Sequence, residues 1–320
     1  MQASTQKGNA PAARKARAGF IWQLLDNRKA TVGAVIVLLF VLMALFGPLL
    51  LKTDPGAFVG PPHQEPSSEY LLGTTGQGQD VLAQTIAGAR TSLLVGVLAG
   101  LAVMAIGAFI GMSAGFFGGW VDSVLSLITN VFLIIPGLPM AVVIAAYLRP
   151  GPVTIGFVLV LTGWAWNARV LRSQMLSLRE KDFVSAAIVS GEGSLRIIFR
   201  EILPNMTSLL MSGFISATVY AIGAQVGLEF LGLGDVSVVT WGTNLYWASN
   251  NAALITGAWW TVVPTGVCVA LVGFALVLIN FAIDEITNPR LRSERAWTRL
   301  LKSHDLEEGL STPVMRHRGN

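Results

Sequence analysis

The residue types that could do chemistry in this chain are few and lie far apart in the sequence. It holds three histidines (His63, His304 and His317) and one cysteine, Cys268, which lies in an apolar run. Their spacing matches no metal-binding motif, and one cysteine cannot form an internal disulfide. No acid pair and no serine, histidine and aspartate arrangement stands out. The sequence therefore indicates no catalytic residue, no metal site and no cofactor site in this chain.

A phosphate-binding loop is also missing from the sequence. The pattern G-x-x-x-x-G-K-[ST] does not occur, and neither does the dipeptide Gly-Lys. That loop supplies the backbone amides that hold nucleotide phosphates. If the protein moves a solute with energy from ATP, a partner must bind the nucleotide.

The clearest pattern lies in a polar loop at residues 169–205, between two apolar stretches. Two amphipathic segments there flank Gly191, which permits a sharp turn, and a proline ends the second segment. A short helix that projects from a membrane bundle is suited to a groove on another protein. The residues expected to make this contact are Asp182, Phe183, Ser185, Ala186, Ala187, Gly191, Leu203 and Pro204.

The composition indicates what kind of protein carries this loop. Of the 320 residues, 53% are apolar and 12% are charged, about half the usual globular share of charge. This is too little charge to cover the surface of a soluble domain, so lipid is the expected solvent for most of the chain. A soluble enzyme, a disordered protein and a coiled coil are excluded.

Six apolar runs predict an all-α integral membrane protein with six transmembrane helices. The predicted core contains five of these helices and the polar loop. The predicted spans are about 30–51, 87–117, 121–147, 153–168, 206–230 and 260–283. The predicted organisation is a basic N-terminal segment at 1–29, a first helix at 30–51, an extracytoplasmic loop at 52–86, a five-helix core at 87–284 and a tail at 285–320.

The distribution of basic residues predicts the orientation of these spans. The N-terminal segment, the 169–205 loop and the tail together hold nineteen of the 22 lysines and arginines. Only Lys52, Arg90 and Arg149 fall on the other side. Because cytoplasmic segments carry the excess of basic residues, both termini are expected in the cytoplasm. The positive net charge then needs no nucleic-acid partner.

Glycines and prolines inside the spans predict how the helices pack. Gly107, Gly111 and Gly115 recur every four residues, a spacing that lets helix backbones approach closely in lipid. They are interpreted as a helix-packing seam, either static or moving during function. Pro136 and Pro139 are predicted to kink or break the third span.

The centres of the predicted spans lack acidic residues. A proton-coupled carrier usually keeps an ionisable group at mid-membrane, so a secondary carrier is disfavoured. A membrane enzyme is also disfavoured, because no catalytic groups converge at one depth.

The outer loop after the fifth span holds aromatic and acidic residues but no basic ones. Trp241, Tyr246 and Trp247 suggest either an interfacial aromatic belt or contacts to a solute or partner. Glu229 and Asp235 are expected to be solvated or to meet basic groups of a partner.

The polar loop resembles the EAA loop of permease subunits of binding-protein-dependent ABC importers. The letters SAAIVSG followed by REILPN are similar to the family pattern, although Ser185 replaces its acidic residue. The stretches YLLGTTGQGQDVLAQTIAGARTSL, FLGLGDVSVVTWGTNL, GAWWTVVPTG and DEITNPRLR resemble the dipeptide/oligopeptide/nickel permease group, in particular the C-type permease of the pair. Thr75 and Gln79 stand where that group commonly has Asp and Arg.

The resemblance covers about residues 20–292 and implies a type I ABC importer permease fold in a bacterial or archaeal plasma membrane. It implies a second homologous permease, two ABC ATPase subunits that bind ATP and Mg, and an extracytoplasmic solute-binding protein. In that family the EAA loop forms a coupling helix that docks on an ATPase subunit. Peptides are the leading expected solute, and oligosaccharides or a metal chelate are the alternatives.

Overall fold

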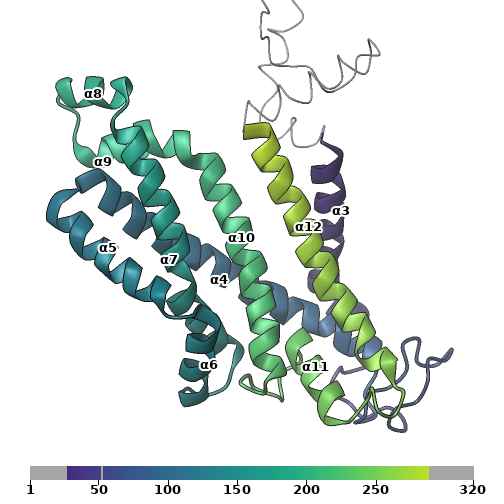
Figure 1. The fold of residues 1–320 in the computed structure, drawn as a ribbon. Coiled ribbons are helices and arrows are strands. Elements are labelled where there is room, and N and C mark those ends of the chain that lie inside the picture. The colour runs from purple at the N-terminus through teal and green to yellow at the C-terminus, as the bar shows by residue number, and fades with distance from the viewer. Residues whose placement is uncertain (1–26, 52, 288–320) are drawn as a thin grey trace, which may run out of the picture.

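The computed structural model describes residues 27–51 and 53–287, and its helices carry the labels of Figure 1, which begin at α3. In this part of the chain the regular structure is helical, apart from an isolated bridge between Thr74 and Asp80. The prediction of an all-α chain is confirmed for these residues. The predictions for most of the basic N-terminal segment and for the tail fall on 1–26 and 288–320, outside the described residues.

Three long helices come first, and shorter elements separate the long helices that follow. The long helices are α3 (Arg28–Leu50), α4 (Val81–Phe117), α5 (Gly119–Ile134), α7 (Pro152–Arg179), α10 (Leu203–Phe230) and α12 (Val263–Thr287). The shorter elements are α6 (Gly137–Tyr147), α8 (Asp182–Val189), α9 (Ser194–Arg196), a π-helix (Ile197–Ile202), α11 (Trp241–Asn250) and a 3-10 turn (Trp259–Thr261).

Within the described residues, five helical segments are long and apolar enough to cross a membrane, and α5 with α6 would make a sixth. These two helices are bent by 86° where the chain passes Ile135 and Pro136. The predicted break at Pro136 is therefore confirmed. The prediction for Pro139 agrees with the same break, because Pro139 lies in the first turn of α6 and has no N–H to bond the carbonyl of Ile135, where the two helices part.

Two of the predicted spans are much shorter than the helices of the structure. Helix α4 begins at Val81 instead of 87, because the Asp80 carboxylate accepts a hydrogen bond from the backbone N–H of Leu82 at 2.8 Å. Helix α7 continues to Arg179 instead of ending at 168. The first part of the predicted 169–205 loop is therefore helix, which buries Leu171 and Met175 as it continues.

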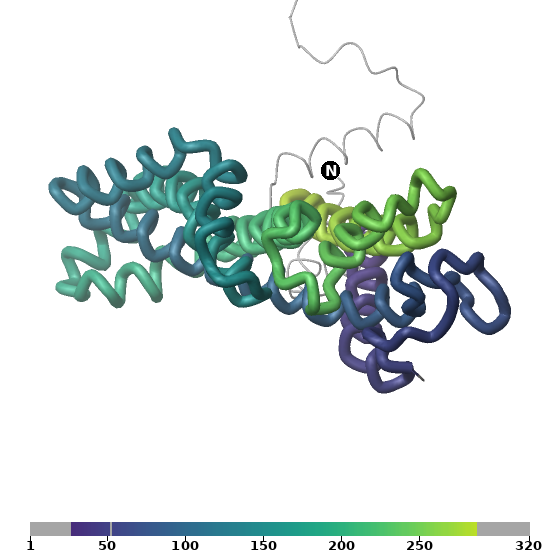
Figure 2. Tube along the Cα trace, turned by 90° about the horizontal axis from the view of Figure 1, so that it is seen from below, coloured from purple at the N-terminus to yellow at the C-terminus, as the bar shows by residue number. Residues whose placement is uncertain are grey.

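Helix α4 is the central element of the molecule. It runs behind α7 and α10 in Figure 1 and packs against both. Seen from below in Figure 2, α5 to α7 lie at one end of an elongated bundle, α3 and α12 at the other, and α10 between them. Helices α3 and α12 pack against each other along this second end.

Glycines let α4 approach its two neighbours closely. A Cβ atom on Gly115 would lie 2.8 Å from the Cβ of Met175 and 2.9 Å from the carbonyl oxygen of Arg172, both on α7. Gly107 and Gly111 face the same helix, whereas Gly100 faces Thr218 of α10. The three glycines of the proposed seam thus lie between α4 and α7, and movement along this seam stays a prediction.

Buried tryptophans fix α11 to the end of α4. Trp241 is fully buried, and its indole N–H donates to the Thr85 carbonyl at 3.0 Å. Its backbone N–H donates to the Ser92 hydroxyl at 3.0 Å. Trp260 is also buried and donates to the Thr74 carbonyl. The prediction of an interfacial belt or a solute contact is therefore wrong for Trp241, because α11 folds back onto α4 and covers it.

The acidic residues of the same outer region are held by local hydrogen bonds. Glu229 is 1% exposed, and its carboxylate accepts from the hydroxyl of Thr240 at 2.5 Å and from the amide of Gln225 at 3.0 Å. The prediction that Glu229 is solvated or meets a partner is therefore wrong. Asp235 is half-buried, and the hydroxyl and backbone N–H of Ser237 hold the pKa of its carboxyl below the ordinary value.

Candidate functional site

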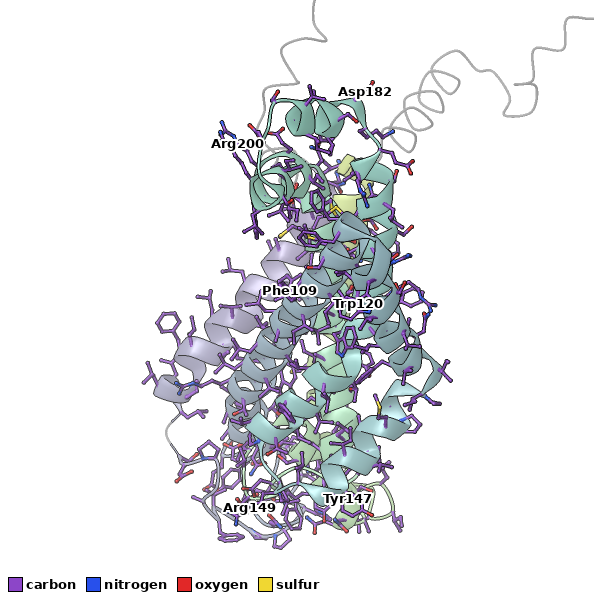
Figure 3. All side chains as sticks on the ribbon, turned by 90° about the vertical axis from the view of Figure 1, so that its left-hand side faces the viewer. Phe109, Trp120, Tyr147, Arg149, Asp182 and Arg200 are labelled. Carbon is purple, nitrogen blue, oxygen red and sulfur yellow. The ribbon has the colours of Figure 1, made fainter. Side chains whose placement is uncertain are left out.

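The loop singled out in the sequence forms a projection at one end of the bundle. Helix α8 lies at its tip, beyond the ends of α7 and α10 (Figure 1), and the chain then turns at Gly191, whose φ is +76°. This left-handed conformation favours glycine. Figure 3 shows Asp182 and Arg200 at this end of the molecule and Tyr147 and Arg149 at the opposite end.

The predicted contact residues fall into an outward group and an inward group. Asp182, Phe183, Ser185, Ala186 and Gly191 are exposed at the tip of the projection. Ala187 and Leu203 are half-buried and pack against the cluster beneath α8, while Pro204 is exposed in the first turn of α10. The structure therefore brings five of the eight residues together on one exposed tip, and the other three lie toward the bundle.

The exposed surface of the projection includes further apolar residues. Ile188 and Leu195 are exposed, and Val189 is exposed over 87% of its surface. Ile188 and Leu195 were not predicted as contacts, whereas the amphipathic segment before Gly191 predicts Val189 on the docking surface. A short helix that exposes apolar side chains in water is the usual form of a protein-docking element.

A buried cluster joins α8 firmly to the bundle. Val184 of α8 is fully buried and belongs to one apolar cluster with Met175 of α7 and Ile202 of the π-helix. The cluster, which also contains Met206 of α10, thus packs α8 against α7 and the start of α10.

The outer surfaces of the helices differ sharply in polarity. Helices α3 and α4 expose long apolar side chains, among them Leu38, Leu45 and Phe109, which suit lipid. Helices α7 and α10 instead expose Arg169, Ser173, Ser216 and Tyr220, with Trp166. We call the surface formed by these five residues the polar face. Polar side chains on a membrane-spanning helix usually face water or a partner rather than lipid.

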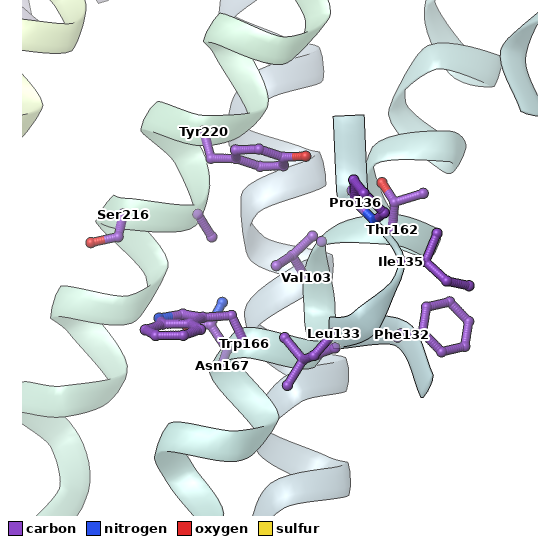
Figure 4. A pocket seen from close by; sticks show the side chains of 14 residues that line it. Val103, Phe132, Leu133, Ile135, Pro136, Thr162, Trp166, Asn167, Ser216 and Tyr220 are labelled. Atoms are coloured by element: carbon purple, nitrogen blue, oxygen red, sulfur yellow. The ribbon is translucent and has the colours of Figure 1, made fainter. Parts of the chain in front are cut away.

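A cavity of about 360 Å³ opens on the polar face. It lies between the break at Pro136, the middle of α7 and the middle of α10, as Figure 4 shows. Tyr220 extends from α10 toward the break, and Trp166 lies beside Ser216. The cavity thus combines aromatic rings with hydroxyl and amide groups, a lining typical of small-molecule sites.

Two arginines of α7 lie beside this cavity, toward the projecting end. Arg172 forms a two-point ion pair with Asp122 of α5, with N···O distances of 2.5 and 2.6 Å. Arg169 donates to the side-chain oxygen of Asn130 at 2.7 Å. Among the residues that the structure describes, no group of histidine, cysteine, aspartate and glutamate side chains is arranged to hold a metal.

Family models match most of this chain. Residues 107–293 match the family described as binding-protein-dependent transport system inner membrane component. The chain belongs to this family. Residues 18–67 match the model for the N-terminal TM domain of oligopeptide transport permease C. The predicted resemblance is confirmed, and the protein is a multi-pass membrane permease of a transport system rather than an enzyme.

Curated relatives of this permease resemble it over nearly their full lengths. The dipeptide transport system permease protein DppC of Alkalihalophilus pseudofirmus is 33% identical over 85% of this chain and 89% of its own. The oligopeptide transport system permease protein OppC of Mycobacterium tuberculosis is 32% identical over 87% of this chain and 96% of its own. The protein of the same name from Bacillus subtilis is 30% identical over 83% and 87%.

The two positions where this permease departs from the group's common motif are in contact. The backbone N–H of Thr75 donates to the carbonyl of Gln79 at 2.8 Å, and the backbone N–H of Gln79 donates to the hydroxyl of Thr75 at 3.1 Å. Both positions therefore lie in one turn, while the Gln79 side chain bonds the Gly56 carbonyl and the Gln84 amide instead of the Thr75 side chain.

Proposed function

We propose that this permease is the C-type subunit of an ATP-driven importer of dipeptides or oligopeptides in a bacterial or archaeal plasma membrane. Its partners would be a second homologous permease, two ABC ATPase subunits and an extracytoplasmic solute-binding protein. The permease itself holds no cofactor in this proposal, and ATP and Mg bind to the ATPase subunits. The printed names of the relatives, which are peptide permeases, favour peptides over oligosaccharides or a metal chelate.

The observation that carries the proposal is the exposed tip of α8 above its buried cluster. Phe183, Ala186 and Val189 are exposed there, while Val184 is fixed in the bundle. A cytoplasmic ATPase subunit that receives α8 in a groove could therefore move α7 and α10 when it binds or releases nucleotide. Such rigid-body coupling is a common way to switch a membrane protein between two states.

The polar face supports a pathway shared with the second permease. The polar residues of α7 and α10 and the cavity beside Pro136 gather on one side, away from the apolar surface of α3 and α4. In this proposal six spans, with α5 and α6 as the broken third, cross the membrane with both termini in the cytoplasm. Two such faces opposed would enclose a water-accessible passage.

A bulky residue at the tip of α8 tests this function. Ala186 is exposed, whereas Ala187 packs against the cluster, so Ala186→Trp obstructs the docking surface without filling the core. In the reconstituted complex, uptake of a labelled peptide should require ATP and should fall about tenfold or more in the variant, the loss expected when a contact at the centre of an interface is blocked.

A matched control comes from the opposite end of the molecule. Ile255 is 89% exposed there, so Ile255→Trp adds the same side chain away from α8 and should leave uptake unchanged. The ATPase subunits should co-purify with the control and not with Ala186→Trp. Normal ATP-driven uptake by Ala186→Trp would contradict the coupling role. Uptake that needs a proton gradient instead of ATP would indicate that the protein is a secondary carrier.

A further inference from the structure

We infer that Arg169 binds a carboxylate of the transported solute as it passes along the polar face. The inference rests on the proposed function, because it requires that solute crosses the membrane beside α7 and α10. It adds a property of the solute, a free carboxylate, that the family alone does not assign to any residue of this chain.

The position of Arg169 follows from the residues that line the larger cavity. Trp166 and Leu133 line it, on α7 and α5 respectively. Arg169 follows Trp166 by three residues, and Asn130 precedes Leu133 by three, so each lies on the same helix face as its neighbour. The hydrogen bond between Arg169 and Asn130 thus lies one turn beyond the cavity, toward α8.

Arg169 and Asn130 line a second cavity of about 200 Å³. Helix α4 contributes buried small residues, including Gly111 and Ala114, while α5 contributes Ser126 and Thr129. Arg169 and Asn130 are exposed at its walls. The hydroxyls of Ser126 and Thr129 already donate to Asp122 and to the Leu125 carbonyl, so the guanidinium of Arg169 is the group that can bind a small anion here.

The charges around the pair leave Arg169 as the free cation of this cavity among the residues that the structure describes. Arg172 also lines it, but Asp122 neutralises that side chain through two hydrogen bonds. Arg169 meets the neutral amide of Asn130, and in the described part of the chain no carboxylate lies within 4.0 Å of its nitrogens.

A carboxylate can accept hydrogen bonds from the remaining N–H groups of Arg169. Arginine has five N–H donors in a planar fork that matches both oxygens of a carboxylate, and Asn130 accepts from one nitrogen of the fork. A charged group within a span is costly unless it meets water or an opposite charge. A peptide with a free C-terminus supplies that charge, whereas a neutral oligosaccharide does not.

Two peptides of one neutral sequence test the inference, one with a free C-terminal carboxylate and one with a C-terminal amide. Uptake of each would be measured in the reconstituted complex for the wild type, Arg169→Gln, Arg169→Lys and Asn130→Asp. Each variant's rate is divided by the wild-type rate for the same peptide, so that selectivity of the binding protein cancels.

Arg169→Gln should lower uptake of the free-acid peptide about tenfold, since a hydrogen bond to a charged group has about this worth. Uptake of the amide should stay within about twofold of wild type by the same reasoning, because no such bond is lost. Asn130→Asp should also lower uptake of the free-acid peptide and spare the amide, because its new carboxylate would pair with Arg169 in place of the solute. Arg169→Lys keeps the charge and should retain most uptake of the free acid.

Two results would overturn the inference, and a third would overturn the proposed function with it. Equal loss for both peptides would assign Arg169 a structural role, or binding of a lipid phosphate if added anionic lipid changed the loss. Unchanged ratios in Arg169→Gln and Asn130→Asp would remove any role in selectivity. If the wild type imported neither peptide, the proposed function itself would fail, whereas normal wild-type import with unchanged ratios would reject only this inference. If Arg169→Gln did not assemble, Asn130→Asp would decide.

Discussion

The ion pair between Asp122 and Arg172 ties the start of α5 to the middle of α7. Both carboxylate oxygens are used, and Ser126 donates a further hydrogen bond to the same carboxylate at 2.8 Å. The two side chains are partly exposed, at 21% and 34%. The contribution of this ion pair to the stability of the fold is therefore expected to lie between that of a surface pair and that of a buried pair.

We predict that Asp122→Asn destabilises the permease by about 1–2 kcal/mol, because Arg172 then loses a charged acceptor. The double variant Asp122→Asn with Arg172→Met should recover part of this loss, since no unpaired cation remains. Thermal unfolding in detergent would give the loss of stability for Asp122→Asn, for Arg172→Met and for the double variant. Strictly additive losses in the double variant would show that the two side chains do not interact.

At the scale of elements, the contact between α4 and α7 decides the packing of the bundle. Gly111 lies against the carbonyl oxygen of Ala168, and Gly107 and Gly115 lie on the same side of α4. In lipid there is little hydrophobic drive between helices, so close backbone approach supplies much of their attraction. The glycine spacing is thus a requirement of this contact.

Gly111→Ala should lower the free energy of unfolding by about 1–3 kcal/mol, because the new methyl group overpacks the seam against Ala168. Gly273→Ala is the matched control, since a Cβ atom there meets nothing within 4 Å. The control should be neutral or stabilising by up to about 1 kcal/mol, from helix propensity. Thermal unfolding of both variants in detergent checks this, and equal behaviour of the two would refute the close-contact interpretation.

At the scale of the whole molecule, the two ends are chemically different. The projection with α8 forms one end, and α11 lies at the other (Figure 1). The proposed orientation places α8 in the cytoplasm. It depends on the distribution of lysines and arginines along the chain.

Cysteine labelling would test this orientation. In a Cys268→Ser background, Val189→Cys at the α8 end and Ile255→Cys at the other end introduce thiols at sites that are 87% and 89% exposed. A membrane-impermeant maleimide should label Ile255→Cys from outside the plasma membrane and Val189→Cys only in inverted vesicles. Labelling of Val189→Cys from outside would reverse the topology.

Structural features that depend only on residues close together in the chain could be predicted from the amino-acid sequence. Long apolar runs predicted a helical membrane protein, because lipid requires every backbone group to be bonded within a segment. Pro136 predicted the break in the third span, since proline lacks the N–H that a continuous helix needs. The polar stretch around Gly191 predicted the turn after α8, and the ordered motifs predicted the family.

Contacts between residues far apart in the chain could not be predicted from the sequence, because they depend on how the helices pack. Trp241 contacts Thr85 across 156 positions of sequence, so its burial could not be deduced from an aromatic loop. Glu229 is enclosed because α11 returns over the end of α10. Arg169 meets Asn130 only because α5 and α7 lie side by side, and it stays exposed while Arg172 is neutralised. Local pattern specifies a helix and its ends, whereas the partner of a charge depends on how the helices are packed.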